Sequence, residues 1–211
     1  MSARRTRIKF CGLRREADLA VALELGVDAI GLIFADGSPR SLEPADARRL
    51  RARIPPFVNV VALVRDAAPQ RIAEILDAVR PHWLQFHGNE TDADCQRAGT
   101  PYLKAIGMQG LDDVPAALAA YPGAAGFVLD GHAPGAAGGS GQRFDWQIWP
   151  QTTSRPLILA GGLTADNVHE AIQHLRPWAV DVSSGIESAP GEKCAERMHR
   201  FVAEVRRADA D

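Results

Sequence analysis

Two reactive side chains stand directly after apolar, strand-like segments. Cys11 ends the segment RIKFC, and Asp130 ends the segment GFVLD. A carboxylate that follows an apolar run is costly to bury unless it is paired or used in a reaction. A thiol can serve as a general base where a nearby positive charge lowers its pKa, and Lys9, two residues earlier, faces the same side of the strand. On opposite walls of one pocket, Cys11 and Asp130 could act as a base and an acid on two sides of a substrate.

Cys11 and two further polar candidates each have a structural interpretation beside the functional one. A free cysteine such as Cys11 is often a small buried hydrophobe. Arg40, in the segment SPR, could hold a carboxylate by its planar fork or simply reach solvent. His87, which ends the segment WLQFH, is either a hydrogen-bonded core histidine or a pocket residue. We count Arg40 and His87 as candidate substrate-binding residues.

Small residues after two later apolar runs predict a phosphate site. Gly161 and Gly162 follow PLILA, and Ser183, Ser184 and Gly185 follow WAVDV. Glycines leave backbone N–H groups free to bind an anion, and in a barrel the loops after the seventh and eighth strands meet to hold phosphate. The alternative is a pair of ordinary glycine-containing turns.

A glycine-rich run at 138–141 follows the segment that Asp130 ends. It contains Gly139, Ser140 and Gly141. This run could close over the same phosphate, or it could be a flexible hinge of a lid. We include its three residues in the expected phosphate site.

These candidates must be positioned by a regular alternation of strands and helices. Eight strand-like segments occur, at 7–11, 29–34, 57–64, 83–87, 102–107, 126–130, 156–161 and 178–184. Amphipathic stretches lie between them, with helix-start signals at Pro44, Pro69 and Thr164. Uninterrupted apolar strands are typical of a parallel sheet that is covered on both faces. The pattern predicts a single-domain (β/α)8 TIM barrel over 1–211, with its core at about 7–205, and the alternative is an open doubly wound sheet.

Composition excludes several other classes of protein. The 211 residues are 46% hydrophobic and 24% charged, with a formal net charge of -2. That balance disfavours a basic nucleic-acid or membrane-surface protein. The N-terminal segment lacks the apolar stretch of a signal peptide. The sequence contains no run of 18 apolar residues, so we expect no transmembrane helix. We therefore expect no nucleic-acid partner and no membrane partner.

Cysteine and histidine spacing predicts neither disulfides nor a metal site. Three cysteines lie far apart with no CxxC motif, which is typical of free thiols in a reducing cytoplasm. The histidines form no pair with a known ligand spacing; they are His82, His87, His132, His169, His174 and His199. We expect no metal and no cofactor.

Several motifs, in order and spacing, resemble one enzyme family. They are KFCG (9–12), SPR (38–40), QFHG (85–88), LD (129–130), GGSG (138–141), LAGGL (159–163) with Asn167, and DVSSGIE (181–187). Together they resemble phosphoribosylanthranilate isomerase of tryptophan biosynthesis, over residues 7 to about 205. The combination of KxCG with DVSSGxE is specific, whereas LAGGL alone is shared with other phosphate-binding barrels.

The resemblance implies an aldose–ketose isomerase, an intramolecular oxidoreductase that works without a cofactor. It would convert N-(5-phosphoribosyl)anthranilate to 1-(2-carboxyphenylamino)-1-deoxyribulose 5-phosphate by an Amadori rearrangement. In that reaction Asp130 would be the general acid, Cys11 the general base, and Arg40 the residue that orients the anthranilate part. The phosphate would be held by Gly161, Gly162, Ser183, Ser184 and Gly185, with the 138–141 run closing over it. The partner is then a small phosphosugar, and the chain is either a monomer or a homodimer.

Two positions depart from the family pattern. Cys194 stands where an aspartate is common, and Ala165 stands where a proline is frequent. Both lie at expected helix starts, so they affect capping, by about 1 kcal/mol, rather than the chemistry.

Two other functions stay open at this point. A different phosphosugar barrel enzyme is one, but an indole-glycerol-phosphate synthase would need a catalytic lysine in the pocket, and a pentose-phosphate epimerase would need a set of metal ligands. The other is a phosphate-binding barrel without catalytic activity, for which a retained Cys11 and Asp130 would have no use.

Overall fold

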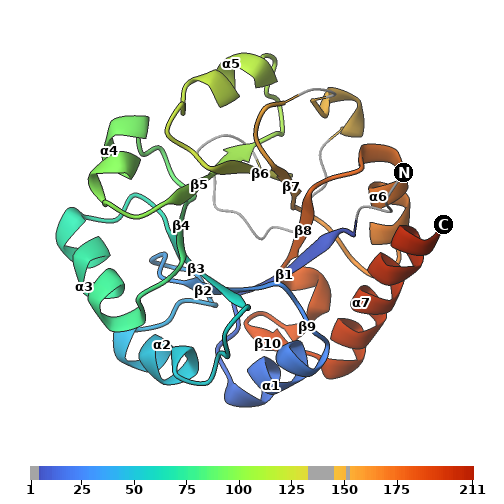
Figure 1. The fold of residues 1–211 in the computed structure, drawn as a ribbon, viewed down its shortest axis with the longest axis horizontal. Coiled ribbons are helices and arrows are strands. Elements are labelled where there is room, and N and C mark those ends of the chain that lie inside the picture. Colours follow the sequence, from blue (N-terminus) through green and yellow to red (C-terminus); the bar gives the residue numbers. More distant parts are fainter. Residues whose placement is uncertain (1–4, 133–144, 151–152) are drawn as a thin grey trace.

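Eight parallel strands form a closed barrel in the computed structural model, which describes residues 5–132, 145–150 and 153–211 (Figure 1). Every strand lies within two residues of its expected bounds at each end. The strands are β1 (Arg7–Cys11), β2 (Ala29–Ile33), β3 (Asn59–Val64), β4 (Trp83–Phe86), β5 (Tyr102–Gly107), β6 (Gly126–Asp130), β7 (Leu157–Leu159) and β8 (Ala179–Val182).

Pairing between the first and last strands closes the barrel. β1 pairs with β2 on one side and with β8 on the other, and in the second pairing Lys9 lies opposite Asp181. A doubly wound sheet would leave two unpaired edges, so that alternative is wrong. The predicted (β/α)8 barrel is confirmed.

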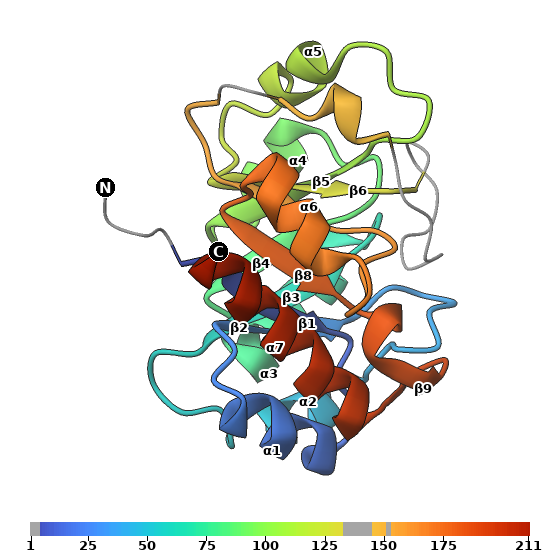
Figure 2. The same ribbon diagram turned by 90° about the vertical axis from the view of Figure 1, so that its right-hand side faces the viewer.

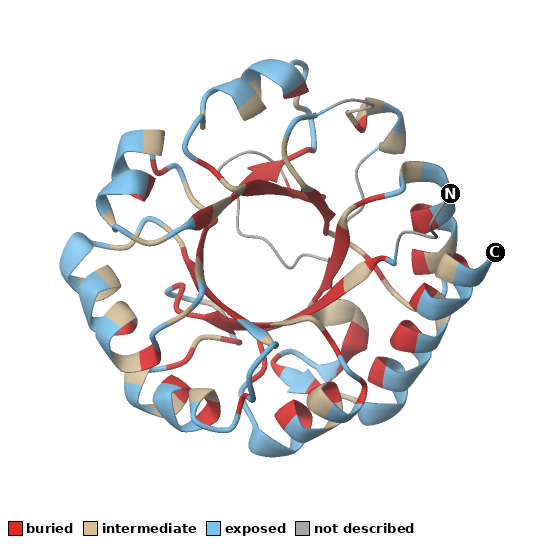
Figure 3. Ribbon diagram, in the orientation of Figure 1, coloured by how far each residue is buried: buried red, intermediate tan, exposed pale blue. Residues whose placement is uncertain are grey.

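Helices surround the strand ring and turn their buried residues toward it (Figures 1 and 3). Pro44 and Pro69 each occupy the first position of a helix, as their sequence context predicts. The helices are α1 (Glu16–Glu24), α2 (Pro44–Arg51), α3 (Pro69–Val79), α4 (Asp92–Arg97), α5 (Val114–Ala119), α6 (Val168–Leu175) and α7 (Ala195–Ala210). No helix among the described residues is long and apolar enough to cross a membrane.

The start expected at Thr164 is wrong by several residues, because α6 begins at Val168. Asn167 explains the difference. Its Oδ1 accepts a hydrogen bond from the Thr164 N–H at 3.0 Å, and its Nδ2 donates to the Gly162 carbonyl at 2.9 Å. These bonds hold the segment before α6 as a turn that is fastened to the end of β7.

Irregular elements follow the last strands. The described part of the β6–β7 connection contains a short 3-10 helix, η1 (Trp146–Ile148), where a strict βα repeat would place an α-helix. After β8 come a second 3-10 helix, η2 (Ser184–Ile186), and an antiparallel hairpin of β9 (Glu187–Ala189) and β10 (Glu192–Lys193). The hairpin was not expected from the sequence; Figure 2 shows β9 at the end of the barrel where α7 begins.

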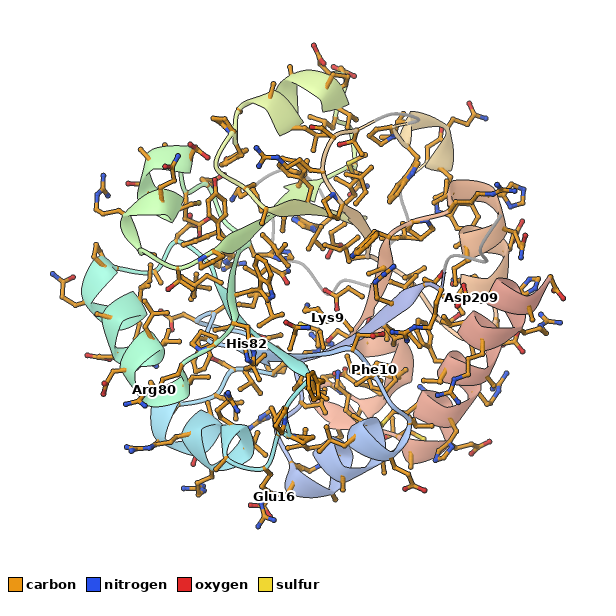
Figure 4. All side chains as sticks on the ribbon, viewed as in Figure 1. Lys9, Phe10, Glu16, Arg80, His82 and Asp209 are labelled. Carbon is orange, nitrogen blue, oxygen red and sulfur yellow. The ribbon has the colours of Figure 1, made fainter. Side chains whose placement is uncertain are left out.

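Side chains on β1 show how the two sides of a strand differ. Phe10 points outward and meets Phe201 of α7 edge-on, with 6.2 Å between the ring centroids. Lys9 points into the ring (Figure 4) and is buried there. The larger apolar core therefore lies between strands and helices, and charged groups occupy part of the barrel interior.

The N-terminus of α7 lacks a side-chain cap. Cys194 occupies the N-cap position and its side chain makes no capping hydrogen bond. We predict that Cys194→Asp raises the free energy of unfolding by about 1 kcal/mol, because a carboxylate can accept from the free N–H groups and interacts favourably with the helix dipole. Urea unfolding would measure the change. Cys194→Ala is the control and should bring no gain; equal midpoints for the Asp and Ala variants would contradict the prediction.

Candidate active site

A cavity of about 240 Å³ opens at the carboxyl ends of the strands. Its lining includes every predicted site residue that the structure describes, namely Cys11, Arg40, His87, Asp130, Gly161, Gly162, Ser183, Ser184 and Gly185. Gly139, Ser140 and Gly141 lie outside the described residues. The fold thus brings together side chains from six separate strands and their loops, at the face where TIM barrels carry out chemistry.

Cys11 lies at the end of β1 with its sulfur against β2. A Cβ atom at Gly31 would come within 2.7 Å of the Cys11 Sγ atom, so the thiol occupies space that only a glycine leaves open. Burial raises the pKa of Cys11, although Lys9 acts in the opposite direction. In the free site Lys9 therefore does not leave Cys11 with a lowered pKa, because desolvation is the larger effect.

Lys9 is held by an ion pair inside the barrel. Its Nζ atom lies 2.5 Å from Oδ2 of Asp181, and both side chains are buried. Burial opposes the charge on Lys9, but Asp181 and Cys11 outweigh it and raise the pKa of the ammonium. Asp181 was not among the predicted site residues, although it opens the DVSSGIE motif. Its place opposite Lys9 depends on the β1–β8 register, which a single sequence does not show.

Asp130 ends β6 beside two imidazoles. Its Oδ1 lies 3.1 Å from Nδ1 of His132, and its Oδ2 lies 3.9 Å from Nε2 of His87. The two rings stack with their centroids 4.7 Å apart. Burial alone would raise the pKa of Asp130, but His132 and His87 outweigh it and lower that pKa. Burial also lowers the pKa of His87 to about 4, so this imidazole is neutral at physiological pH.

His132 was missed as a site residue by sequence reasoning. A usable signal exists, because His132 lies two residues after Asp130, and alternate residues share one side of an extended segment. The argument from ligand spacing also missed its proximity to His87, which comes from a different strand. Structural proximity, not sequence distance, decides which histidines meet.

Arg40 reaches the cavity with its guanidinium already paired. Its Nε and Nη2 atoms each donate to a carboxylate oxygen of Glu187 at 2.8 Å. Lys193 also donates to Glu187, at 2.8 Å. The predicted carboxylate-binding fork is therefore occupied by a partner from β9, and a ligand would meet the remaining Nη1 edge. Glu187 and Lys193 position Arg40, and neither was predicted.

The two expected phosphate loops lie against each other. A Cβ atom at Gly185 would come within 1.8 Å of the Leu163 carbonyl oxygen, which shows how closely the loop after β8 approaches the loop after β7. Ser183 donates from Oγ to the Cys11 carbonyl at 3.0 Å, so its hydroxyl ties the same loop to β1. Glycine at 185 is required by this contact, and the loops share one wall of the cavity.

Comparisons with known proteins agree with this arrangement. The family model described as N-(5'phosphoribosyl)anthranilate (PRA) isomerase matches residues 8–204. An N-(5'-phosphoribosyl)anthranilate isomerase of Xanthomonas campestris pv. campestris is 53% identical, covering 97% of this chain and 95% of that protein. The crystal structure of phosphoribosyl anthranilate isomerase from Thermotoga maritima is 35% identical with a TM-score of 0.87, covering 95% of this chain and 98% of that one. The Thermus thermophilus structure of that name is 34% identical with a TM-score of 0.85, covering 96% and 99%.

Removal of one partner from the buried ion pair should destabilise the barrel. We predict that Lys9→Met lowers the free energy of unfolding by about 3–5 kcal/mol, because it leaves the Asp181 carboxylate buried without its counter-charge. The double variant Lys9→Met/Asp181→Leu should recover most of that loss, since it removes both charges. Denaturant unfolding of the three proteins measures the effect; a double variant no more stable than the single one would contradict it.

Proposed function

The chain belongs to the N-(5'-phosphoribosyl)anthranilate isomerase family, and from that premise we propose how its cavity isomerises the family's substrate. The observation that carries the proposal is the family match over residues 8–204 together with a cavity that holds Cys11 and Asp130. The same match decides against an indole-glycerol-phosphate synthase or a pentose-phosphate epimerase. The reaction is an isomerisation in tryptophan biosynthesis.

The rearrangement is an internal oxidation and reduction of the sugar. Asp130 protonates the furanose ring oxygen, the bond from that oxygen to C1 breaks, and an iminium forms between C1 and the anthranilate nitrogen. Cys11 then removes the proton from C2, and the electron pair of that bond neutralises the iminium to give an enolamine. When the enolamine becomes the ketone, C2 is oxidised and C1 is reduced. Such an aldose–ketose isomerase, an intramolecular oxidoreductase, needs no external electron carrier.

Substrate charge provides the protonation states that this sequence needs. In the free cavity burial raises the pKa of Cys11, which favours the thiol, and the imidazole neighbours lower the pKa of Asp130, which favours the carboxylate. The reaction needs the other form of each group. The carboxylate and phosphate of the substrate bring negative charge, which raises the pKa of a buried acid. The iminium formed by ring opening is positive and favours the Cys11 thiolate. Acid and base therefore become competent in the order in which they act.

We propose that the remaining residues orient the substrate. The Nη1 edge of Arg40 holds the anthranilate carboxylate, while Glu187 fixes the rest of the guanidinium. Neutral His87 offers a ring nitrogen to a sugar hydroxyl. Gly161, Gly162, Ser183, Ser184 and Gly185 bind the phosphate through their backbone, together with the 138–141 run.

Three wider expectations stay predictions. The free thiols of Cys11, Cys95 and Cys194 favour a reducing cytoplasm. The whole chain is expected to be one domain with a core at about 7–205. One solved structure shows monomers made from the dimeric isomerase of Thermotoga maritima. For this chain, a monomer and a homodimer are both compatible with the proposed site.

The acid and the base should each be essential for turnover. Cys11→Ser and Asp130→Asn are expected to lower kcat by about two to four orders of magnitude, because each removes a proton-transfer group, with little change in ligand affinity. A fluorescence assay that follows the loss of phosphoribosylanthranilate measures turnover. Cys194→Ser, at the half-buried N-cap of α7, is the matched control and should keep full activity. Near-normal turnover in either site variant would contradict the mechanism. An inactive wild type would favour the alternative of a phosphate-binding barrel without catalytic activity.

The contact between the two phosphate loops offers a separate test of the phosphate site. Gly185→Ala forces a Cβ atom against the Leu163 carbonyl, so the loops must move apart. We expect KM to rise about 10-fold or more, equivalent to about 1.4 kcal/mol of binding free energy. Steady-state kinetics give KM and kcat separately. Gly99→Ala, at a positive φ with open space around it, is the control for general loss of stability; equal KM values in both variants would argue against the site.

A further inference from the structure

A cluster of two imidazoles and one carboxylate lies where β4 and β6 end. His87, Asp130 and His132 each offer one ligand atom, and these atoms all lie within 4.8 Å of one another. Two of the separations are 3.1 and 3.9 Å, both to Asp130. Ligand atoms on a tetrahedral zinc ion lie about 3.3 Å apart, given metal–ligand bonds of about 2.0–2.2 Å. The cluster is thus close to the size of a metal site before any ion has drawn it together.

Two buried polar atoms at this cluster, Nε2 of His87 and Oε1 of Gln85, have no hydrogen-bond partner among the described residues. Nδ1 of His132 lies 3.1 Å from Oδ1 of Asp130, but the geometry of that contact does not meet the criteria for a hydrogen bond. The side-chain amide of Gln85 lies against Nδ1 of His87, with 3.3 Å between the nitrogens. If the amide turns to present Oε1, Nδ1 of His87 becomes the donor and its Nε2 carries the lone pair. Gln85 Oε1 would then accept the His87 Nδ1–H and orient that histidine from behind, and one bound ion would take the lone pairs of His87 Nε2 and His132 Nδ1.

Backbone hydrogen bonds hold the cluster in place. The Met108 N–H donates to the Asp130 carbonyl at 2.9 Å, and the Gln109 N–H donates to the His132 carbonyl at 3.1 Å. These bonds continue the pairing of β6 with β5 past the last residue of the strand. His132 therefore does not depend on a free loop for its position, and the ligands are arranged in advance.

From this geometry we propose that His87, Asp130 and His132 form a site for a divalent transition-metal ion such as Zn²⁺, and that its occupation inhibits the enzyme. Two nitrogen ligands and one oxygen ligand suit Zn²⁺ and Co²⁺, whereas Mg²⁺ prefers oxygen ligands alone. His87 and Asp130 line the cavity, so an ion has a path to the site and keeps an open position there. The inhibitory half rests on the proposed function, because an ion bound to the Asp130 carboxylate keeps it from carrying the proton that is transferred to the sugar ring.

Direct binding of metal alone tests the site without reference to activity. Co²⁺ absorbance and Zn²⁺ calorimetry on the full chain should show one ion per chain, and Mg²⁺ should not compete. His132→Gln should weaken Zn²⁺ binding by about 10-fold or more, since even the loss of an outer partner costs that much. His199→Gln, on the exposed side of α7, is the matched control and should bind like the wild type. Equal affinity in wild type and His132→Gln, or a loss only in His199→Gln, would overturn the proposal.

Inhibition is measured in the same proteins. Zn²⁺ should abolish wild-type turnover reversibly, with recovery on addition of a chelator, and the half-inhibiting concentration should rise about 10-fold or more in His132→Gln. One bound ion with undiminished turnover would overturn the inhibitory role. A wild type that binds Zn²⁺ but shows no isomerase activity would count against the proposed function and leave the metal site standing. His87→Gln gives a second ligand variant if His132→Gln fails to fold.

Discussion

The Lys9 ammonium and the Asp181 carboxylate meet inside the ring, where its first and last strands pair. Removing either charge from water costs several kcal/mol, so each is stable in the interior only beside the other. Lys9 is on β1 and Asp181 is on β8, the two strands whose pairing closes the barrel. A slip of one residue between β1 and β8 would turn one of these side chains toward the helices. The ion pair therefore links the closure of the barrel to one register.

That register also determines the surroundings of Cys11. The thiol lies two residues beyond Lys9, against Gly31 of β2, and the Ser183 hydroxyl bonds its carbonyl from the loop after β8. Lys9 favours the thiolate while burial opposes it, and burial has the larger effect in the free cavity. In the proposed reaction this bias keeps the Cys11 thiol protonated until a cation forms beside it. Asp130, the proposed acid, has the complementary bias, because its imidazole neighbours lower its pKa in the free cavity.

Strand positions were predictable because buried parallel strands are continuous apolar runs, and the residues that end them had to meet at one face. That argument singled out Cys11 and Asp130 as candidates, and the family resemblance then implied their roles. The rest depended on contacts between distant segments. Glu187 pairs with Arg40 through a hairpin that has no apolar pattern. Asn167 delays the start of α6 through its bonds to the preceding turn.

Asp130 shows why a proposed general acid and a proposed metal ligand can be the same residue. A general acid must be shielded from water, yet it needs neighbours that exchange hydrogen bonds as its charge changes. Imidazole neighbours meet this need, because a ring nitrogen can donate to the carboxylate or accept from the acid. The same nitrogens and the Asp130 carboxylate lie close enough together to form the proposed ligand set for Zn²⁺. A residue at 132 without a lone pair would remove the third metal ligand and leave Asp130 in place. His132 therefore separates metal binding from acid catalysis, whereas Asp130 and His87 take part in both proposals.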